Sequence, residues 1–421
     1  VMEFELINHP IDCPVCDQAG ECKLQDYYMS YDVKKSRMEV KQVNKNKKMD
    51  FGCGVVHDQE RCVVCGRCVR FCRQITKTGE LGIINRTDDA RVNIFPGRPL
   101  NNRYALNVVD LCPVGAMTSK DFRFKQRVWF LKKALGICHG CSRGCNITIE
   151  HNREKYKDDV IYRFRPRLNE QVNGYFMCDS GRLSYHLEND NRVTESKIGK
   201  QSIDQAEVLQ AAKRELEADG KVVMVLSPNC SLEQMIAVRA LAEKIGATLS
   251  GFSDGYFKEG DGDDYLICDD KSANRAGLNL LEIDQTKDAF ESAMTQANLL
   301  VIFNNDLSLS YSEDELKHLL QGKRVVAIAS HQSPVTDAAD ILIPAASYSE
   351  YTGSVINCEN VLQTFAKAVT KNHNPADICE IAAQLGSPLQ TPEACVTELG
   401  RCIDQFKDLD QIPAAGLKLN V

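Results

Sequence analysis

The sequence of 421 residues lacks several patterns that define common functional classes. No apolar run approaches the roughly 20 residues of a membrane-spanning helix, so we expect any membrane association to pass through other subunits. The net charge is −7 and no large basic surface is indicated, which makes nucleic acid an unexpected partner. No G-x-G-x-x-G follows a predicted strand and no G-x4-G-K-[ST] occurs, so the chain itself is not expected to bind NADH or ATP.

Cysteine, by contrast, is abundant. The chain has 19 cysteines, and most of those in the first 145 residues stand in C-x2-C steps. Such steps in a long chain without a signal peptide are typical of metal ligands rather than disulfides, which favours a reducing compartment. The chain begins at Val1, in what reads as the middle of an element, so we expect a further segment upstream.

The sequence is organised around a C-x2-C-x2-C-x3-C run followed, about forty residues later, by Cys-Pro. This is the pattern of a bacterial-type ferredoxin, in which three thiolates and a remote Cys-Pro hold a cubane cluster. A second run would need cysteines at positions 102, 105 and 108, where none occurs. The sequence therefore predicts one 4Fe–4S cluster, with Cys72 left without a partner. Its predicted ligands are Cys62, Cys65, Cys68 and Cys112. A four-sulfur zinc site is the alternative.

Upstream lies a second motif, H-x3-C-x2-C-x5-C, in which Gly20 lets the loop fold back on itself. Four such ligands within fourteen residues can close around one metal centre, and a histidine in place of a thiolate tends to raise a cluster's potential. We expect a second 4Fe–4S cluster here. Its predicted ligands are His9, Cys13, Cys16 and Cys22. A zinc site with one His and three Cys ligands is the alternative.

A third constellation has the spacing C-x2-C-x3-C and a remote fourth cysteine. Three cysteines in eight residues plus one at a distance predict a third 4Fe–4S cluster, and His139 between them is expected to be a bystander. The predicted ligands are Cys138, Cys141, Cys145 and Cys178. Zinc, or a site without metal that is held by packing, is the alternative.

Two further expectations concern residues near these motifs. Cys53 and His57 precede the ferredoxin-like run, and we interpret them as a packed thiol and a surface imidazole because that cluster already has four ligands. The segment 121–135 contains the only tryptophan, Trp129, and is predicted to be a linker helix in which the indole is a packing anchor.

After about residue 195, buried apolar strands alternate with helices, which predicts a doubly wound parallel sheet. Strands are expected at 221–227, 298–303, 324–329 and 341–343. Helices are expected at 231–245, from 312, at 375–385 and at 392–406. Cys379, Cys395 and Cys402 are interpreted as small core residues.

The fold class is therefore α+β iron–sulfur modules followed by an α/β doubly wound domain. The predicted modules are 1–52 around the one-His-three-Cys motif, 53–134 as a ferredoxin-like module, 135–195 around the third constellation, and 196–421 as the α/β domain.

The stretches 9–26 and 111–116 closely resemble the G subunit family of NADH:quinone oxidoreductase, whose mitochondrial members are the 75 kDa iron–sulfur subunits. The third constellation is similar to an extra cluster of some bacterial members and of molybdenum enzymes. The stretch 339–357 resembles the late part of the molybdopterin-oxidoreductase domain with which the family ends.

The resemblance implies an oxidoreductase subunit without a catalytic site of its own, which relays single electrons through 4Fe–4S clusters from a flavin subunit toward quinone. The implied partners are the flavin- and NADH-binding subunit and the quinone-side iron–sulfur subunits of complex I. The implied location is peripheral, on the cytoplasmic side of the inner membrane.

Family members begin with a 2Fe–2S domain, so that cluster is expected only if an upstream domain exists. The α/β domain is much shorter than in molybdenum enzymes, and no molybdenum cofactor is expected. Glu350, Gly353 and Asn357, where active relatives approach the pterin, are expected only to shape a turn.

Two other functions stay open. One is an electron-transfer subunit of an NAD-linked hydrogenase or formate dehydrogenase, which the missing second ferredoxin cluster disfavours. The other is an enzyme with its own molybdenum site, which the short domain disfavours.

Overall fold

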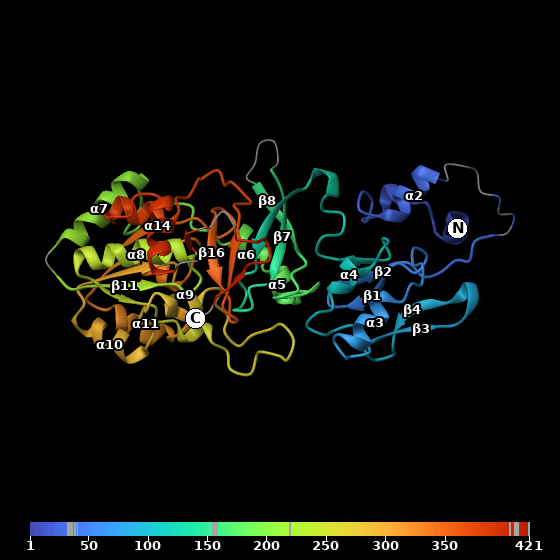
Figure 1. Ribbon diagram of the computed structural model, residues 1–421, viewed down its shortest axis with the longest axis horizontal. Helices are drawn as coiled ribbons and strands as arrows, with labels where there is room; N and C mark the ends of the chain where they lie inside the picture. Colours follow the sequence, from blue (N-terminus) through green and yellow to red (C-terminus); the bar gives the residue numbers. More distant parts are fainter. Residues whose placement is uncertain are drawn as a thin grey trace. The chain divides into compact units, whose positions relative to one another are not determined.

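The computed structural model describes residues 1–31, 37, 39, 41–153, 159–218, 220–403, 406–407 and 412–419 (Figure 1). The chain forms two compact units. The N-terminal unit contains residues 1–132 and 176–183, and the C-terminal unit contains residues 133–175 and 184–421. The division into four modules that the sequence suggests stays a prediction.

The N-terminal unit is built from short elements around the cysteine loops. In chain order they are α1 (Met2–Leu6), η1 (Cys13–Val15), α2 (Lys23–Tyr31), β1 (Met49–Gly52), β2 (Val55–His57), α3 (Arg67–Gln74), β3 (Leu81–Ile84), η2 (Thr87–Asp89), β4 (Arg91–Ile94), α4 (Asn107–Leu111), β5 (Met117–Ser119), η3 (Val128–Phe130) and α5 (Asp179–Leu183). Strands β1, β2 and β5 form an antiparallel sheet, and β3 and β4 form a separate hairpin. Within the described ranges, no helix is both long and apolar enough to cross a bilayer.

Two local predictions in this unit are wrong. Cys53 is exposed and His57 is fully buried, the reverse of the packed thiol and surface imidazole expected. His57 ends the central strand β2, where its ring packs on Phe51 at 4.7 Å between centroids and Nδ1 lies 3.2 Å from the Ala116 carbonyl oxygen. A turn at Cys53, which adopts a φ of 42°, points that residue outward.

The predicted helix at 121–135 is also absent. The segment forms turns, the short η3 and the start of β6, although apolar residues recur at helical spacing at 124, 128, 131 and 135. From Lys132 onward the backbone pairs with β7 instead, so sheet pairing overrides the local pattern. Trp129 is 59% exposed, and its ring edge covers Gly20, where an added Cβ would meet the indole at 2.8 Å. The indole therefore covers the turn in the His9–Cys22 loop instead of entering a core.

The C-terminal unit holds the larger set of elements. In chain order they are β6 (Lys132–Ile137), β7 (Asn146–Arg153), β8 (Asp159–Pro166), α6 (Tyr185–Asn189), β9 (Lys197–Ile198), β10 (Gln201–Ser202), α7 (Gln205–Glu217), β11 (Val222–Leu226), α8 (Leu232–Ile245), β12 (Thr248–Ser250), η4 (Asp254–Tyr256), α9 (Arg275–Leu280), α10 (Lys287–Gln296), β13 (Leu299–Phe303), η5 (Leu307–Leu309), α11 (Glu313–Leu320), β14 (Arg324–Ala329), α12 (Pro334–Asp337), β15 (Ile341–Pro344), β16 (Gly353–Ile356), β17 (Val361–Phe365), α13 (Ile378–Leu385), α14 (Pro392–Cys402) and β18 (Leu417–Lys418).

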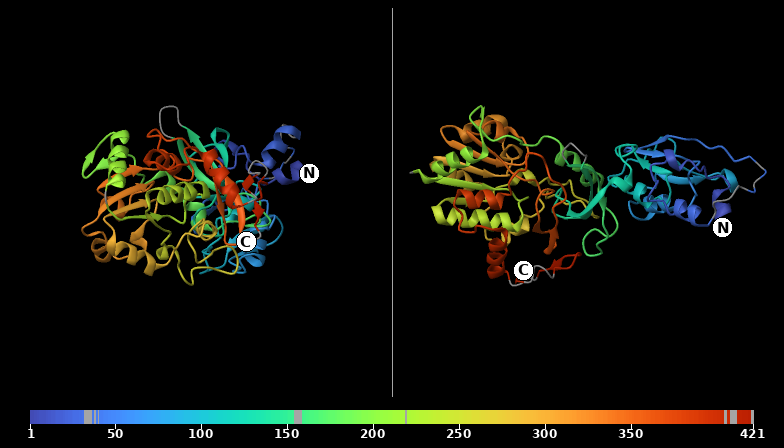
Figure 2. Two further views of the ribbon diagram at one scale, coloured as in Figure 1. Left: turned by 60° about the vertical axis from the view of Figure 1, so that its left-hand side comes forward. Right: turned by 90° about the horizontal axis from the view of Figure 1, so that it is seen from above.

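A seven-stranded sheet with the order β10-β9-β15-β14-β13-β11-β12 forms the centre of this unit. Its five strands from β15 to β12 are parallel, and β9 and β10 add an antiparallel edge. Alternate side chains of each strand face opposite layers. Met224 and Val301 pack with α7, α8, α13 and α14, whereas Val225 and Ile302 pack with α10 and α11. Figures 1 and 2 show these two helix layers, and the predicted doubly wound sheet is confirmed.

Local capping signals explain where the helices begin. Ser231 and Ser312 each form a capping box, with Gln234 and Glu315 respectively, and Gly246 ends α8 with a φ of 68°. The predicted start of α13 at Pro375 is wrong, because the Asp377–Glu380 capping box starts the helix at Ile378. Helix α14 ends at Cys402, short of the predicted 406.

Two smaller sheets in the same unit frame the third cysteine motif. Strands β6, β7 and β8 form one, and β16, β17 and β18 form the other. The loop between β6 and β7 carries the motif, and Ala366 N–H donates to the Leu135 carbonyl across 3.0 Å between the two sheets. Cys379 and Cys395 are buried as predicted, whereas Cys402 is exposed, contrary to prediction, because it lies in the last turn of α14.

Candidate metal centres

The four residues of the first motif line one cavity in the N-terminal unit. They are His9, Cys13, Cys16 and Cys22. Cys16 and Cys22 are buried, and the surrounding wall is mostly apolar, with Ile11, Leu24 and Tyr28 among its residues. The fold thus brings together all four side chains that the sequence predicts as ligands of one centre.

The ring of His9 is suited to bind a metal. Its Nδ1 is buried and has no hydrogen-bond partner among the described atoms. Burial lowers the pKa of His9 more than nearby Asp12 raises it, so the ring is neutral at neutral pH and keeps a lone pair for a metal. An orphaned buried nitrogen beside three thiols fits the one-His-three-Cys centre that the spacing predicts.

Gly115 makes room for one of these thiols. A Cβ at this position would lie 2.1 Å from Cys16 Sγ, far inside contact distance. Gly115 comes from the segment after Cys112, so the ferredoxin-like part of the chain forms one wall of the first centre. Any side chain here would displace Cys16.

The loop of the second motif curls tightly. Val64 and Gly66 both adopt left-handed conformations, with φ of 49° and 72°, and α3 starts directly afterwards with Cys68 in its first turn. Cys112 lies at the carboxyl end of α4. The left-handed residues turn the chain so that successive thiols face one region, as a cubane cluster requires.

The thiols of Cys62, Cys65 and Cys112 are near enough to Cys68 to raise its pKa. Burial, followed by the neighbouring thiols of Cys112 and Cys62, raises the pKa of Cys68 to about 12. Burial likewise raises the pKa of Cys112 to about 11. Both thiols are therefore protonated at neutral pH in the metal-free chain, and binding to iron must release protons.

One apolar cluster contacts residues of both motifs. Val114 and Ala116 are buried and pack with Cys22 of the first motif and with Cys62 and Cys112 of the second. The same short segment thus supports both sites.

Cys72 is not among the predicted ligands, and its neighbour in the structure is Glu80. Cys72 is fully buried in α3, and burial, followed by the nearby Glu80 carboxylate, raises its pKa to about 12. A thiol held protonated beside a carboxylate is suited to packing and not to metal binding.

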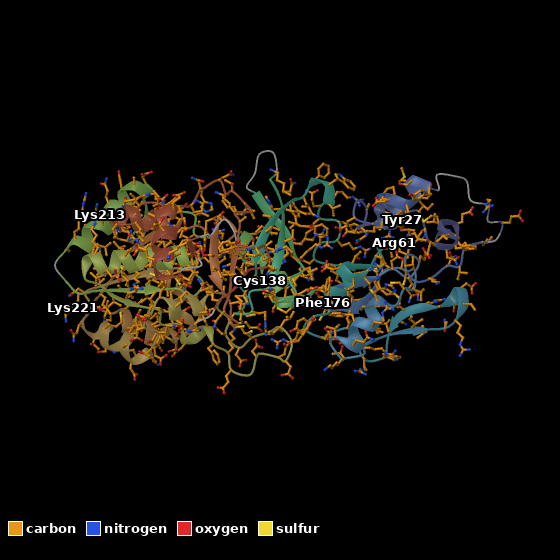
Figure 3. All side chains as sticks on the ribbon, viewed as in Figure 1. Tyr27, Arg61, Cys138, Phe176, Lys213 and Lys221 are labelled. Carbon is orange, nitrogen blue, oxygen red and sulfur yellow. The ribbon has the colours of Figure 1, made fainter. Side chains whose placement is uncertain are left out.

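The third motif forms a closed loop between β6 and β7. Cys138, Cys141 and Cys145 are all buried, and the Cys138 N–H donates to the Cys145 carbonyl across 2.8 Å. Figure 3 labels Cys138 in the C-terminal unit, whereas Cys178 belongs to the N-terminal unit, where its sulfur lies 3.3 Å from Ser180 Oγ. The four-cysteine set of the third cluster therefore stays a prediction.

His139 has a packing role in the described structure. Its Nδ1 lies 3.0 Å from the Ile137 carbonyl oxygen, and its ring stacks on Tyr348 with 3.9 Å between centroids. Burial lowers the pKa of His139 to about 4. These contacts account for Nδ1 and the face of the ring, whereas Nε2 is buried without a hydrogen-bond partner among the described atoms.

Two cysteines near the third motif were not identified from the sequence as part of any site. Cys268 Sγ and Cys358 Sγ lie 3.8 Å apart, and Cys268 also neighbours Cys141. They are 90 positions apart and stand in no C-x2-C step, so no local signal could have linked them.

Within the part of the chain that the structure describes, no three His, Cys, Asp or Glu side chains already surround the position of a single metal ion. A cubane cluster binds its four thiolates at separate corners, so this finding concerns single ions.

Comparison with known proteins supports the resemblance. Residues 1–37 match the NADH-ubiquinone oxidoreductase-G iron-sulfur binding region, and residues 52–118 match the ferredoxin-like domain of NADH-quinone oxidoreductase subunit 3. Both N-terminal motifs thus lie in regions typical of iron–sulfur binding. The predicted resemblance to the G subunit family is confirmed.

Several curated relatives carry the name of this family. The NADH-quinone oxidoreductase G subunit of Rickettsia conorii is 33% identical over 259 residues, covering 59% of this chain and 37% of that protein. The G subunit of Streptomyces coelicolor is 37% identical over 195 residues, covering 46% and 22% respectively. The mitochondrial 78 kDa subunit of NADH-ubiquinone oxidoreductase from Neurospora crassa is 34% identical over 256 residues, covering 59% and 34%. The match therefore covers between 22% and 37% of the length of these relatives.

Among solved structures, a NAD+-reducing [NiFe]-hydrogenase matches with a TM-score of 0.26 and 22% identity, covering 30% of this chain and 55% of the hydrogenase chain.

Proposed function

We propose that this chain is an electron-transfer subunit of a respiratory NADH:quinone oxidoreductase, which relays single electrons through 4Fe–4S clusters. The observation that carries the proposal is the cavity lined by His9, Cys13, Cys16 and Cys22, in which a buried imidazole nitrogen has no other partner. The matches of residues 1–37 and 52–118 to two iron–sulfur regions of this family support it.

The proposed ligands follow the three motifs. The first centre takes His9, Cys13, Cys16 and Cys22. The second takes Cys62, Cys65, Cys68 and Cys112. The third takes Cys138, Cys141, Cys145 and Cys178. Bound clusters would supply reversible one-electron oxidation and reduction.

The chain's own residues position these ligands and exclude water. Gly115 leaves space for the Cys16 thiol, and Val114 and Ala116 pack between the first two centres. The neutral His9 ring replaces one anionic thiolate, which tends to raise the potential of the first centre relative to a four-cysteine cluster. The protein would thus set the reduction potentials of the clusters through the type of ligand and the burial of each site.

We further propose that the C-terminal unit is a shortened molybdopterin-oxidoreductase-like scaffold without a molybdenum cofactor. The residues that face the pterin in active relatives have structural contacts here. Glu350 pairs with Arg192, and Asn357 Oδ1 accepts hydrogen bonds from the N–H groups of Glu359 and Val361. These contacts stabilise turns, which supports a structural role.

The proposed partners are the other peripheral-arm subunits of complex I, namely the flavin- and NADH-binding subunit and the quinone-side iron–sulfur subunits. The proposed location is the cytoplasmic side of the inner membrane. Both proposals rest on the similarity to the named relatives, and this chain matches only part of the length of those proteins.

The test is to measure iron, acid-labile sulfide, zinc and molybdenum per chain after anaerobic purification. About twelve irons with matching sulfide are expected for three clusters, and about eight would leave the third motif without one. Cys16→Ser and Cys68→Ser should each remove about four irons. Cys53→Ser, which replaces an exposed thiol outside every motif, is the matched control and should leave iron unchanged. Zinc without sulfide would overturn the proposal.

A further inference from the structure

The C-terminal unit contains a pair of cysteines in contact that no predicted cluster uses. Cys268 Sγ and Cys358 Sγ are 3.8 Å apart, close to van der Waals contact between sulfur atoms. Cys268 lies in the loop between η4 and α9, and Cys358 lies in the turn between β16 and β17. Cys358 is exposed and Cys268 is half-buried, so reagents in solution can reach the pair.

The backbone of Ser142 holds the two segments together. Its N–H donates to the Asp270 carbonyl across 2.9 Å, and its carbonyl accepts from the Cys358 N–H across 2.8 Å. Arg143, the next residue, pairs through its guanidinium with Glu359, next to Cys358. The loop of the third motif therefore sets the distance between the two sulfurs.

The loop that carries Cys268 is itself closed. Gly262 N–H donates to Asp269 Oδ1 across 2.6 Å, and Asp263 N–H donates to the Ile267 carbonyl across 2.9 Å. Lys271 Nζ donates to the carbonyl of Cys268 across 2.6 Å. The thiol thus projects from a backbone fixed on both sides, and its proximity to Cys358 is a property of the fold.

We propose that Cys268 and Cys358 form a thiol–disulfide exchange site, which is a dithiol under reducing conditions and closes to an intramolecular disulfide. Bond formation at about 2.05 Å requires the two sulfurs to approach by less than about 2 Å in total, which side-chain rotation can supply. This inference is independent of the proposed electron-transfer function, because neither thiol belongs to a proposed cluster.

The chemistry needs a disulfide reactant, such as glutathione disulfide. The thiolate of one cysteine attacks a sulfur of the reactant, forms a mixed disulfide and releases one glutathione thiolate, which takes up a proton. The second cysteine, after losing its proton to solvent, then attacks the mixed disulfide. The intramolecular disulfide forms and a second glutathione leaves. Two protein thiols are oxidised and one glutathione disulfide is reduced to two thiols.

A second pair of neighbouring thiols in the same unit is buried, and it serves as the comparison for the accessible pair. Cys379 in α13 and Cys395 in α14 are neighbours, but they are only 3% and 0% exposed. Cys141, which neighbours Cys268, is also buried. Because exchange requires in-line access of the reactant to sulfur, Cys268 and Cys358 should react while the buried thiols do not.

The test uses the full chain with its metal content intact, incubated with glutathione disulfide. Free thiols are alkylated under denaturing conditions, and peptides are then analysed by mass spectrometry with and without reduction. A peptide pair linked through Cys268 and Cys358, reversed by dithiothreitol, is expected, with Cys379 and Cys395 still alkylated. A link between Cys268 and Cys141, or two separate glutathione adducts without a link, would overturn the proposal, as would the absence of any reaction at either thiol.

Single variants separate this site from a metal site. In Cys268→Ser the remaining Cys358 should stop at the mixed disulfide with glutathione, and in Cys358→Ser the same should hold for Cys268. Both variants should keep the iron and zinc content of the parent chain. Loss of metal in either variant would overturn the proposal, because it would make that thiol a ligand.

Discussion

Arg61 donates from Nη2 to Oδ2 of Asp12 across 2.6 Å, and this pair joins the loops that carry the first two ligand sets. Asp12 directly precedes Cys13, and Arg61 directly precedes Cys62. The Arg61 side chain is 5% exposed, and its Nε also donates to both oxygens of Asp12 (Figure 3 labels Arg61). Burial opposes ionisation of Asp12, but the hydrogen bonds and positive charges of Arg61 and Lys47 together outweigh burial and lower the pKa of Asp12. A charged pair therefore sets the spacing between two proposed clusters.

Arg61→Ala should destabilise the N-terminal unit by about 2 kcal/mol, because Asp12 and the nearly buried Asp58 lose their guanidinium partner. The Lys47 ammonium stays 3.5 Å and 3.3 Å from these two carboxylates and offsets part of the loss. The measurement is urea unfolding followed by fluorescence of Trp129, the only tryptophan, which lies in this unit. Iron content at the first centre should fall as well, since the loop before Cys13 loses its anchor.

The matched control is Arg37→Ala. Arg37 also pairs with a carboxylate, Glu3, but its side chain is 81% exposed, and exposed pairs contribute about 0–1 kcal/mol. Equal unfolding midpoints for the two variants would contradict the role assigned to Arg61.

The stability of the N-terminal unit should fall as pH drops below about 6.5. Burial lowers the pKa of His57 from 6.5 to about 4, so the folded state keeps the ring neutral while the unfolded state binds a proton. The contribution of this histidine is complete above pH 6.5 and is lost between pH 6.5 and 4. At pH 5 the loss amounts to about 2 kcal/mol relative to pH 7.5, measured by urea unfolding with Trp129 fluorescence.

His57→Gln provides the comparison for this pH dependence. Glutamine does not titrate, so the difference between pH 7.5 and pH 5 should shrink by about the same 2 kcal/mol, even if the variant is less stable at both values. An unchanged difference would assign the acid sensitivity to other groups, such as the cluster ligands.

Gly115→Ala should selectively disturb the first centre. The added methyl group would lie 2.1 Å from Cys16 Sγ, so the thiol or the segment after Cys112 must move. The variant should lose about four irons per chain, with matching sulfide. Gly82→Ala is the control, because its methyl group would meet only the exposed Phe95 ring, at 3.1 Å. Full iron content in Gly115→Ala would show that the centre does not need the Cys16 position seen here.

The sequence predicted those features that local chemistry decides. Ligand spacing predicted that His9 and Cys22 would come together, and both line one cavity. The helices expected at 231–245 and from 312 do begin at these positions, where Ser231 and Ser312 each form a capping box. The continuous apolar strands predicted a sheet covered on both faces. The start of α13 could also have been predicted correctly. The Asp377–Glu380 capping box is a local signal for a helix start at Ile378, and it outweighs the signal from the upstream Pro375.

Features that depend on long-range pairing could not be predicted in the same way. The burial of His57 follows from its place in β2 between β1 and β5, and β5 is about sixty residues away. The contact between Cys268 and Cys358 depends on the Ser142 backbone, which belongs to a third segment. Periodicity and spacing carry no information about such encounters.

Arg192 and Glu350 form a buried ion pair in the C-terminal unit, with side chains 4% and 3% exposed. Arg192 also donates from Nε to the Ser330 carbonyl across 2.9 Å, and the Ser347 N–H donates to Glu350 Oε2 across 2.6 Å. Glu350→Gln should therefore cost about 3 kcal/mol, because the guanidinium stays buried without its counter-charge. The measurement is amide hydrogen exchange, which should be faster in β14 and β15 of Glu350→Gln than in the parent chain.

Two comparisons decide whether the charge or the packing of this pair matters. Arg324→Ala removes a half-exposed arginine from the same strand β14, and exchange there should change little. The double variant Arg192→Met with Glu350→Leu removes both charges and should recover much of the stability that Glu350→Gln loses, since well-packed apolar side chains can replace a buried pair. If the double variant were less stable than Glu350→Gln, the hydrogen bonds of Arg192 to the Ser330 and Glu188 carbonyls would be its main contribution, and the ion pair a secondary one.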